Sequence, residues 1–146
     1  MMQTVVRLDS FSPALAERFR KASPQKRRMA AVVACEFASA AAHLSDQEVA
    51  LALDALRHDK AAPPFLQQRL ECLAAQFDDE YLRLDQEEDE SRKPESLRLF
   101  SKSRATWALV FALFHDPAQL HEAIYEAIAA MNDPEELVRA IEVELL

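Results

Sequence analysis

The chain has 146 residues, of which 50% are hydrophobic and 29% are charged, and its formal net charge is −8. This length and balance predict one folded domain, residues 1–146, and exclude an intrinsically disordered chain. Glycine is absent. Its absence argues against phosphate-binding loops, dinucleotide fingerprints, nucleophile elbows and tight hairpins, because all of these use the backbone freedom of glycine.

The composition instead indicates an all-α fold, an irregular bundle of about six to seven helices. Several helix starts carry a capping side chain followed by proline. Ser or Asp accepts unpaired amide hydrogens of the first turn, and proline at the first helical position needs no amide partner. This mark occurs at Ser12-Pro13, Ser23-Pro24, Asp116-Pro117 and Asp133-Pro134. Capping boxes are also predicted from Ser45 to Glu48 and from Asp133 to Glu136.

The first half of the chain is predicted to hold an arm and three helices. Residues 1–11 are interpreted as a short extended arm, and the helices are predicted over about 13–22, 24–43 and 45–58. Small residues in the second helix would let a neighbouring helix approach closely. The inward stripe of that helix is predicted to be Met29, Val33, Phe37 and Ala40.

The second half begins with the clearest amphipathic pattern. Residues 64–84 are predicted to form a fourth helix, because apolar residues recur three or four positions apart. Its inward stripe is Leu66, Leu70, Leu73, Phe77, Tyr81 and Leu84. Residues 85–96 contain no large apolar side chain and are interpreted as an exposed acidic loop. An alternative is that the first part of this stretch extends the fourth helix as a polar end. The last two helices are predicted to begin near Pro117 and Pro134.

Between the acidic loop and these last helices lies the predicted central helix, residues 94–115. It is apolar without a break from Trp107 to Phe114, so it must be enclosed by other helices or by lipid. Eight residues rise only about 12 Å as a helix, far less than the roughly 30 Å hydrocarbon layer of a membrane. We therefore predict no membrane span. The inward stripe, with one polar member, is Leu97, Phe100, Arg104, Trp107 and Phe111.

The cysteines indicate an intracellular protein. Cys35 and Cys72 are far apart and form no CxxC pair, so both are interpreted as reduced core thiols. The first residues lack the basic and long apolar regions of a signal peptide, so we expect a cytoplasmic protein.

The histidines predict no catalytic or metal site, and no cofactor is expected. His43, His58 and His115 lie near predicted helix C-termini, where a cation interacts favourably with the helix dipole. His121 and Glu122 could form a local polar cluster, but a general base also needs a pocket and a substrate. We therefore predict that the chain is not an enzyme.

Charge is unevenly distributed, and the acidic part is the predicted partner-binding surface. A dense set of carboxylates steers basic partners and can occupy their cationic sites. The set is Asp78, Asp79, Asp85, Glu87, Glu88, Asp89 and Glu90. The net negative charge argues against a nucleic-acid partner. A basic cluster at residues 18–28 is interpreted as a solvated corner that faces the acidic loop of the same molecule.

Ser23-Pro24-Gln25-Lys26-Arg27-Arg28-Met29-Ala30, followed by Ala34-Cys35-Glu36, resembles one helix of an uncharacterised all-helical bacterial family. That helix begins SP-x-K-R-R. The chain departs from the family pattern at Cys35, where a Cys-Cys-Arg-Arg run is expected. The resemblance implies a helical protein of bacterial origin and brings no catalytic residues. In size, acidity and helical content, the chain is also similar to immunity proteins that neutralise bacterial toxins.

These observations favour a protein that acts by binding another protein. The most specific hypothesis is an immunity or inhibitor protein that occludes a toxin, such as a basic toxin domain, with its acidic surface. Two alternatives stay open: a helical scaffold or adaptor that binds through an apolar groove, and an enzyme of unknown class. The oligomeric state is left open as well.

Overall fold

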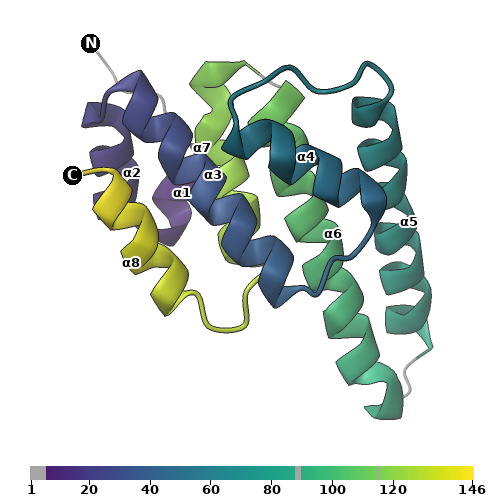
Figure 1. Ribbon diagram of the computed structural model, residues 1–146. Helices are drawn as coiled ribbons and strands as arrows, with labels where there is room; N and C mark the ends of the chain where they lie inside the picture. Colours follow the sequence, from purple (N-terminus) through teal and green to yellow (C-terminus); the bar gives the residue numbers. More distant parts are fainter. Residues whose placement is uncertain (1–5, 88–89, 115) are drawn as a thin grey trace.

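The computed structural model describes residues 6–87, 90–114 and 116–146, and every regular element within them is helical (Figure 1). The all-α prediction is confirmed. The α-helices of these ranges are α1 (Arg7–Phe11), α2 (Pro13–Lys21), α3 (Pro24–Ala41), α4 (Gln47–Arg57), α5 (Leu66–Gln86), α6 (Lys93–Phe114), α7 (Leu120–Ala129) and α8 (Glu135–Glu144). Two short 3-10 helices, η1 (Glu90–Arg92) and η2 (Pro117–Gln119), precede α6 and α7.

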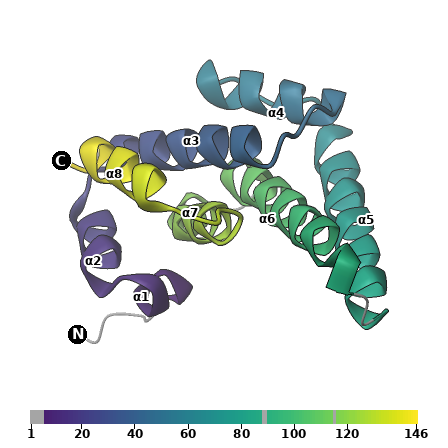
Figure 2. The same ribbon diagram turned by 90° about the horizontal axis from the view of Figure 1, so that it is seen from below.

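Helix α6 is the centre of the bundle, as the sequence predicts. It packs against α3, α4, α5 and α7. Helices α5 and α6 form a long antiparallel pair, and α7 lies between α6 and α3, with α8 against α3 (Figures 1 and 2). Helices α1 and α2 lie near the C-terminus, at the end of the molecule opposite the α5–α6 connection.

The four cap-and-proline marks all act as caps. The acceptors are Ser12 Oγ for Leu15 N, Ser23 Oγ for Lys26 N, Asp116 Oδ1 for Ala118 N and Asp133 Oδ1 for Glu135 N, at 2.9–3.2 Å. The two predicted capping boxes are wrong. Helix α4 begins after Asp46 instead of Ser45, and α8 begins after Pro134. Each shift is one residue, which removes the spacing that a box requires.

The N-terminal arm is helical from Arg7 to Phe11 rather than extended, and residues 1–5 lie outside the described part. The Asp9 side chain accepts the Val6 amide at 2.8 Å, which satisfies an otherwise unpaired donor of the first turn. Leu8 is fully buried and anchors this short helix in the core. The added helix explains why the bundle has one more α-helix than expected.

The acidic loop is shorter than predicted. Helix α5 continues to Gln86, η1 occupies Glu90–Arg92, and α6 begins at Lys93. The extension of α5 agrees with the alternative that the polar stretch begins as the end of this helix, because Glu, Gln, Arg and Lys are good helix formers even where nothing apolar is buried. A polar stretch can therefore extend two packed helices beyond their common core.

The buried face of α3 differs from the predicted stripe. Met29 is 37% exposed, Ala40 is exposed, and Val33 and Phe37 are only half-buried. The face that contacts α6, α7 and α8 is built mainly from small residues: Ala30, Ala31, Ala34, Cys35, Ala38 and Ser39. Helix axes approach according to the size of the side chains at their contact, so small residues form the most enclosed face.

The buried face of α6 also differs from the predicted stripe. Leu97 is 52% exposed, and Phe100, Arg104, Trp107 and Phe111 are half-buried at the flank of the helix. The fully enclosed side chains are Ala105, Thr106, Ala108, Leu109 and Val110. Trp107 and Phe111 therefore pack at the edge of the core and not inside it.

Candidate protein-binding surface and the polar network behind it

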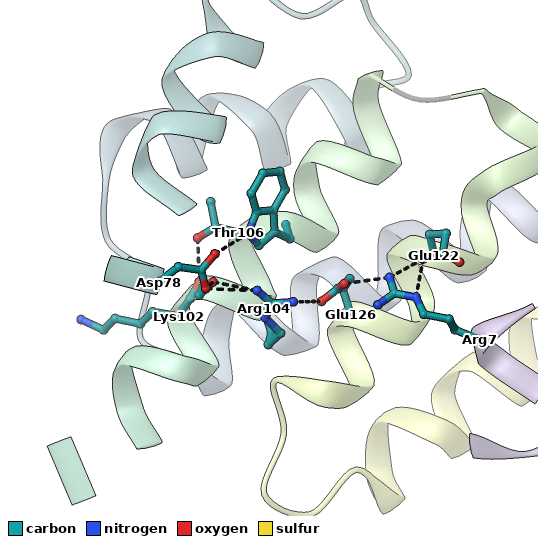
Figure 3. Close-up of polar contacts among 9 residues, drawn as sticks. Arg7, Asp78, Lys102, Arg104, Thr106, Glu122 and Glu126 are labelled. Carbon is teal, nitrogen blue, oxygen red and sulfur yellow. Dashed lines mark hydrogen bonds and ion pairs between the residues drawn. The ribbon is translucent and has the colours of Figure 1, made fainter. Parts of the chain in front are cut away.

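A polar network crosses the bundle from α1 to α5 (Figure 3). At its centre is Glu126 of α7, whose side chain is only 4% exposed. Glu126 accepts from Arg7 Nη2 at 2.8 Å and from Arg104 Nη1 at 3.1 Å, so both carboxylate oxygens are paired. Arg7 also binds Glu122 through Nε at 2.8 Å and lies over the ring of Tyr125. A buried carboxylate tolerates burial only with such pairing.

Asp78 closes the network at α5. Its carboxylate accepts from Arg104 Nη2 at 3.1 Å, from Trp107 Nε1 at 3.1 Å and from the Ser103 hydroxyl. The sequence places Asp78 in the partner surface, whereas the structure places it between α5 and α6 as the acceptor of three donors. The sequence analysis missed Arg7, Glu126 and the role of Arg104. Arg104 itself could have indicated the network, because a single charged residue in an apolar stripe needs a partner of opposite charge.

The other predicted acidic residues remain at the surface. Asp79, Asp85, Glu87 and Glu90 are exposed, as is their neighbour Glu80. Of the five, only Glu87 forms an ion pair with a described residue, Arg92, at 3.5 Å. Glu88 and Asp89 lie outside the described residues. We call Asp79, Glu80, Asp85, Glu87 and Glu90 the acidic end surface.

The basic cluster lies at the other end of the molecule and does not face the acidic loop (Figures 1 and 2). This corrects the interpretation from sequence. Most of its cations are used internally. Arg20 binds Asp9, Arg28 binds Asp59 at 3.2 Å, Arg18 lies 3.6 Å from Glu142, and Lys26 donates to the carbonyl of Leu146. The two ends therefore differ: the basic end is largely paired, and the acidic end is largely open.

The two cysteines differ in environment. Cys35 is fully buried, and burial raises the pKa of its thiol to about 12, so it stays protonated. Cys72 is exposed, which contradicts the prediction of a core thiol. The apolar side of α5 is carried by Leu70 and Ala74, and Cys72 lies between them on the outer side of the helix.

The described histidines lie where a helix ends or begins. His58 caps α4, with Nδ1 3.0 Å from the Asp54 carbonyl, and His43 follows α3 with a left-handed φ of 56°. His115 lies outside the described residues. His121 lies 3.4 Å from Glu122, and burial lowers the pKa of its ring. No group of three potential metal ligands occurs within the described ranges.

A groove lies between the end of α3, the first half of α6 and the α7–α8 connection. Its volume is about 600 Å³. Leu97 and Met131 supply apolar surface, and the charged lining residues are Arg98, Lys102 and Asp133. Arg98 forms no ion pair with the residues described, and Lys102 lies 5.9 Å from the centroid of the Phe77 ring. We call this the α6 groove.

The fold defines an all-α helical-bundle protein, and no described helix is both long and apolar enough to cross a membrane. No family model, curated protein or solved structure matches the chain. The resemblances to a bacterial helical family and to immunity proteins therefore stay predictions.

Proposed function

We propose that this chain is a bacterial cytoplasmic protein that binds a basic protein partner through its acidic end surface, as an immunity or inhibitor protein of a toxin would. The observation that carries the proposal is the set of exposed carboxylates at the end of α5. Asp79, Glu80, Asp85 and Glu90 form no ion pair with any described residue, so their charge is available to a partner. Complementary charge speeds encounter and selects partners more than it adds affinity.

The rigid support of this surface favours the same function. Asp78 lies one residue before the acidic end surface and is held by three donors from α6. The neighbouring carboxylates are therefore presented from a helix that is fixed to the bundle. A preformed surface loses less conformational entropy on binding than a loop does.

Charge reversal at Asp79 and Asp85 is the test of this proposal. With a partner captured by crosslinking from a lysate of the native host, we expect Asp79→Lys/Asp85→Lys to slow association by at least about tenfold and to flatten its salt dependence. Glu136→Lys/Glu144→Lys on α8 is the matched control, because it changes the net charge equally. Association rates measured at low and high salt decide the question, and equal slowing by both variants would contradict the acidic end surface.

The α6 groove supports a second function, a scaffold or adaptor that binds an acidic, apolar segment of a partner. Leu97 is 52% exposed beside Arg98, so the groove combines apolar area with an exposed cation, although Asp133 also lines it. An amphipathic segment with carboxylates at one edge would complement both features.

Leu97→Asp distinguishes the two functions. If the groove binds the partner, this variant weakens capture by at least about tenfold, because a leucine in a binding groove is replaced by a charge that the partner's own carboxylates repel. Val143→Asp is the control, since Val143 is an exposed aliphatic residue on α8, outside the groove and the acidic end surface. Unchanged affinity of the Leu97 variant, measured by titration with the captured partner, would leave the acidic end surface as the binding site.

A further inference from the structure

A pocket that neither function uses lies between α1, α2, the start of α3 and the start of α7. Its volume is about 330 Å³, near the lower end of the range for small-molecule sites. Leu8, Ala16 and Phe19 form apolar walls, and Ala118 lies exposed on its lining. Helices α1 and α2, which line the pocket, lie at the end of the molecule opposite the α5–α6 connection (Figure 1). Two polar residues of the pocket lining, Arg27 and His121, indicate which kind of ligand the pocket can bind.

Arg27 is a positioned cation without a carboxylate partner. Its Nε donates to the Phe19 carbonyl at 2.9 Å and its Nη2 donates to the Arg20 carbonyl, so the guanidinium is fixed at the end of α2. Nη1 forms no hydrogen bond with the described residues. Both acceptors are neutral, so the positive charge of Arg27 is not compensated by a carboxylate. A guanidinium edge that is already fixed binds a carboxylate with little further loss of side-chain entropy.

The other arginine of the pocket is different. Arg20 binds Asp9 and lies 3.5 Å from Glu17, so carboxylates of the chain itself neutralise it. The Val6 amide and Arg20 lower the pKa of Asp9, which keeps that carboxylate charged. Arg27 is therefore the lining cation of the pocket that no described carboxylate pairs with. This charge matches a monoanion, whereas a phosphate dianion would need further donors.

His121 is the second polar group. Its side chain is 15% exposed, and its buried Nδ1 forms no hydrogen bond but lies 3.4 Å from Oε1 of Glu122. The ring meets Phe19 edge-on, with centroids 6.1 Å apart, so the imidazole lies against the apolar wall. A ring nitrogen in such a place adds a donor or an acceptor next to a ligand.

We propose that this pocket binds a small monocarboxylate with a compact apolar tail. The carboxylate lies against Nη1 of Arg27 beside the ring of His121, and the tail packs on Val6, Phe19 and Ala118. This inference does not rest on the proposed protein-binding function, because the two sites share no residue.

Titration of the full chain with benzoate, followed by amide and histidine-ring nitrogen resonances, tests the proposal. We expect saturable shifts at Phe19, Ala118 and His121. Benzamide, which has nearly the same shape but no charge, should bind at least tenfold more weakly. Equal affinity for both probes would overturn the carboxylate assignment, and shifts that do not saturate would overturn the site.

Variants locate the benzoate. Arg27→Met should weaken binding at least tenfold, and so should Ala118→Leu, which adds bulk to the pocket lining and leaves the Arg27 hydrogen bonds intact. Arg18→Met is the control, since Arg18 is an exposed cation of α2 outside the pocket. If Arg27→Met is too unstable to titrate, Ala118→Leu still shows whether benzoate binds in this pocket. Unchanged benzoate affinity in Ala118→Leu, or a loss in Arg18→Met as large as in the pocket variants, would overturn the proposal.

Discussion

Arg104→Met is expected to lower the free energy of unfolding by about 3 kcal/mol, because it removes one partner of a buried carboxylate. The guanidinium bridges Glu126 of α7 and Asp78 of α5, so its loss weakens two helix contacts at once. Glu126 keeps its bond to Arg7, which places the loss at the lower end of the range for broken buried pairs. Urea denaturation followed by circular dichroism measures the change.

The matched control lies on the same helix. Arg98→Met removes an exposed arginine of α6 that has no ion pair among the described residues, and we expect a change within about 0.5 kcal/mol. The double variant Arg104→Met/Glu126→Leu should be more stable than Arg104→Met alone, because it no longer buries an underpaired carboxylate. If the losses of Arg104→Met and Glu126→Leu simply add in the double variant, Arg104 and Glu126 do not stabilise each other, and the contribution of Arg104 lies in its other contacts, such as the bond to Asp78.

The local signals in the sequence were sufficient for the order of helices and for most of their starts. Ser12, Ser23, Asp116 and Asp133 act on amides two or three residues away, so a short stretch of sequence contains both partners of each hydrogen bond. At Ser45, by contrast, local sequence was not enough to predict the helix start correctly. Asp46 and Ser45 are both good caps, and the choice between them depends on how α4 lies against α3 and α6.

Which face of a helix is buried could be predicted only in part. On α7 and α8, large aliphatic residues carry the stripe, and Leu120, Ile124, Leu137 and Ile141 are buried. On α3, the large residues were assumed to face inward, but three helices enclose its alanine face. A helix that is contacted from several sides has no single apolar stripe, so the size of a side chain no longer indicates whether it points into the core.

The candidate site was predictable as a region and not as a set of contacts. Exposure of Asp79 and Asp85 follows from their place on the polar side of an amphipathic helix. The role of Asp78 does not, because its donors come from Ser103, Arg104 and Trp107, at least 25 residues later in the chain. The Glu126–Arg7 pair spans 119 residues. Periodicity carries no information about pairs at this separation.

Leu109→Ala is expected to cost about 3 kcal/mol, because Leu109 of α6 is fully buried and its truncation leaves a cavity in the core. Leu97→Ala, the same substitution three turns earlier, is expected to cost less than about 0.5 kcal/mol, since Leu97 is 52% exposed. Thermal and urea denaturation of the two variants measure the difference. The unbroken apolar run from Trp107 to Phe114 predicts the burial of Leu109 correctly, whereas the predicted apolar stripe wrongly includes Leu97. A larger loss for Leu97→Ala would mean that α6 is rotated relative to the bundle, and the Asp78–Arg104–Glu126 network would have to be abandoned with it.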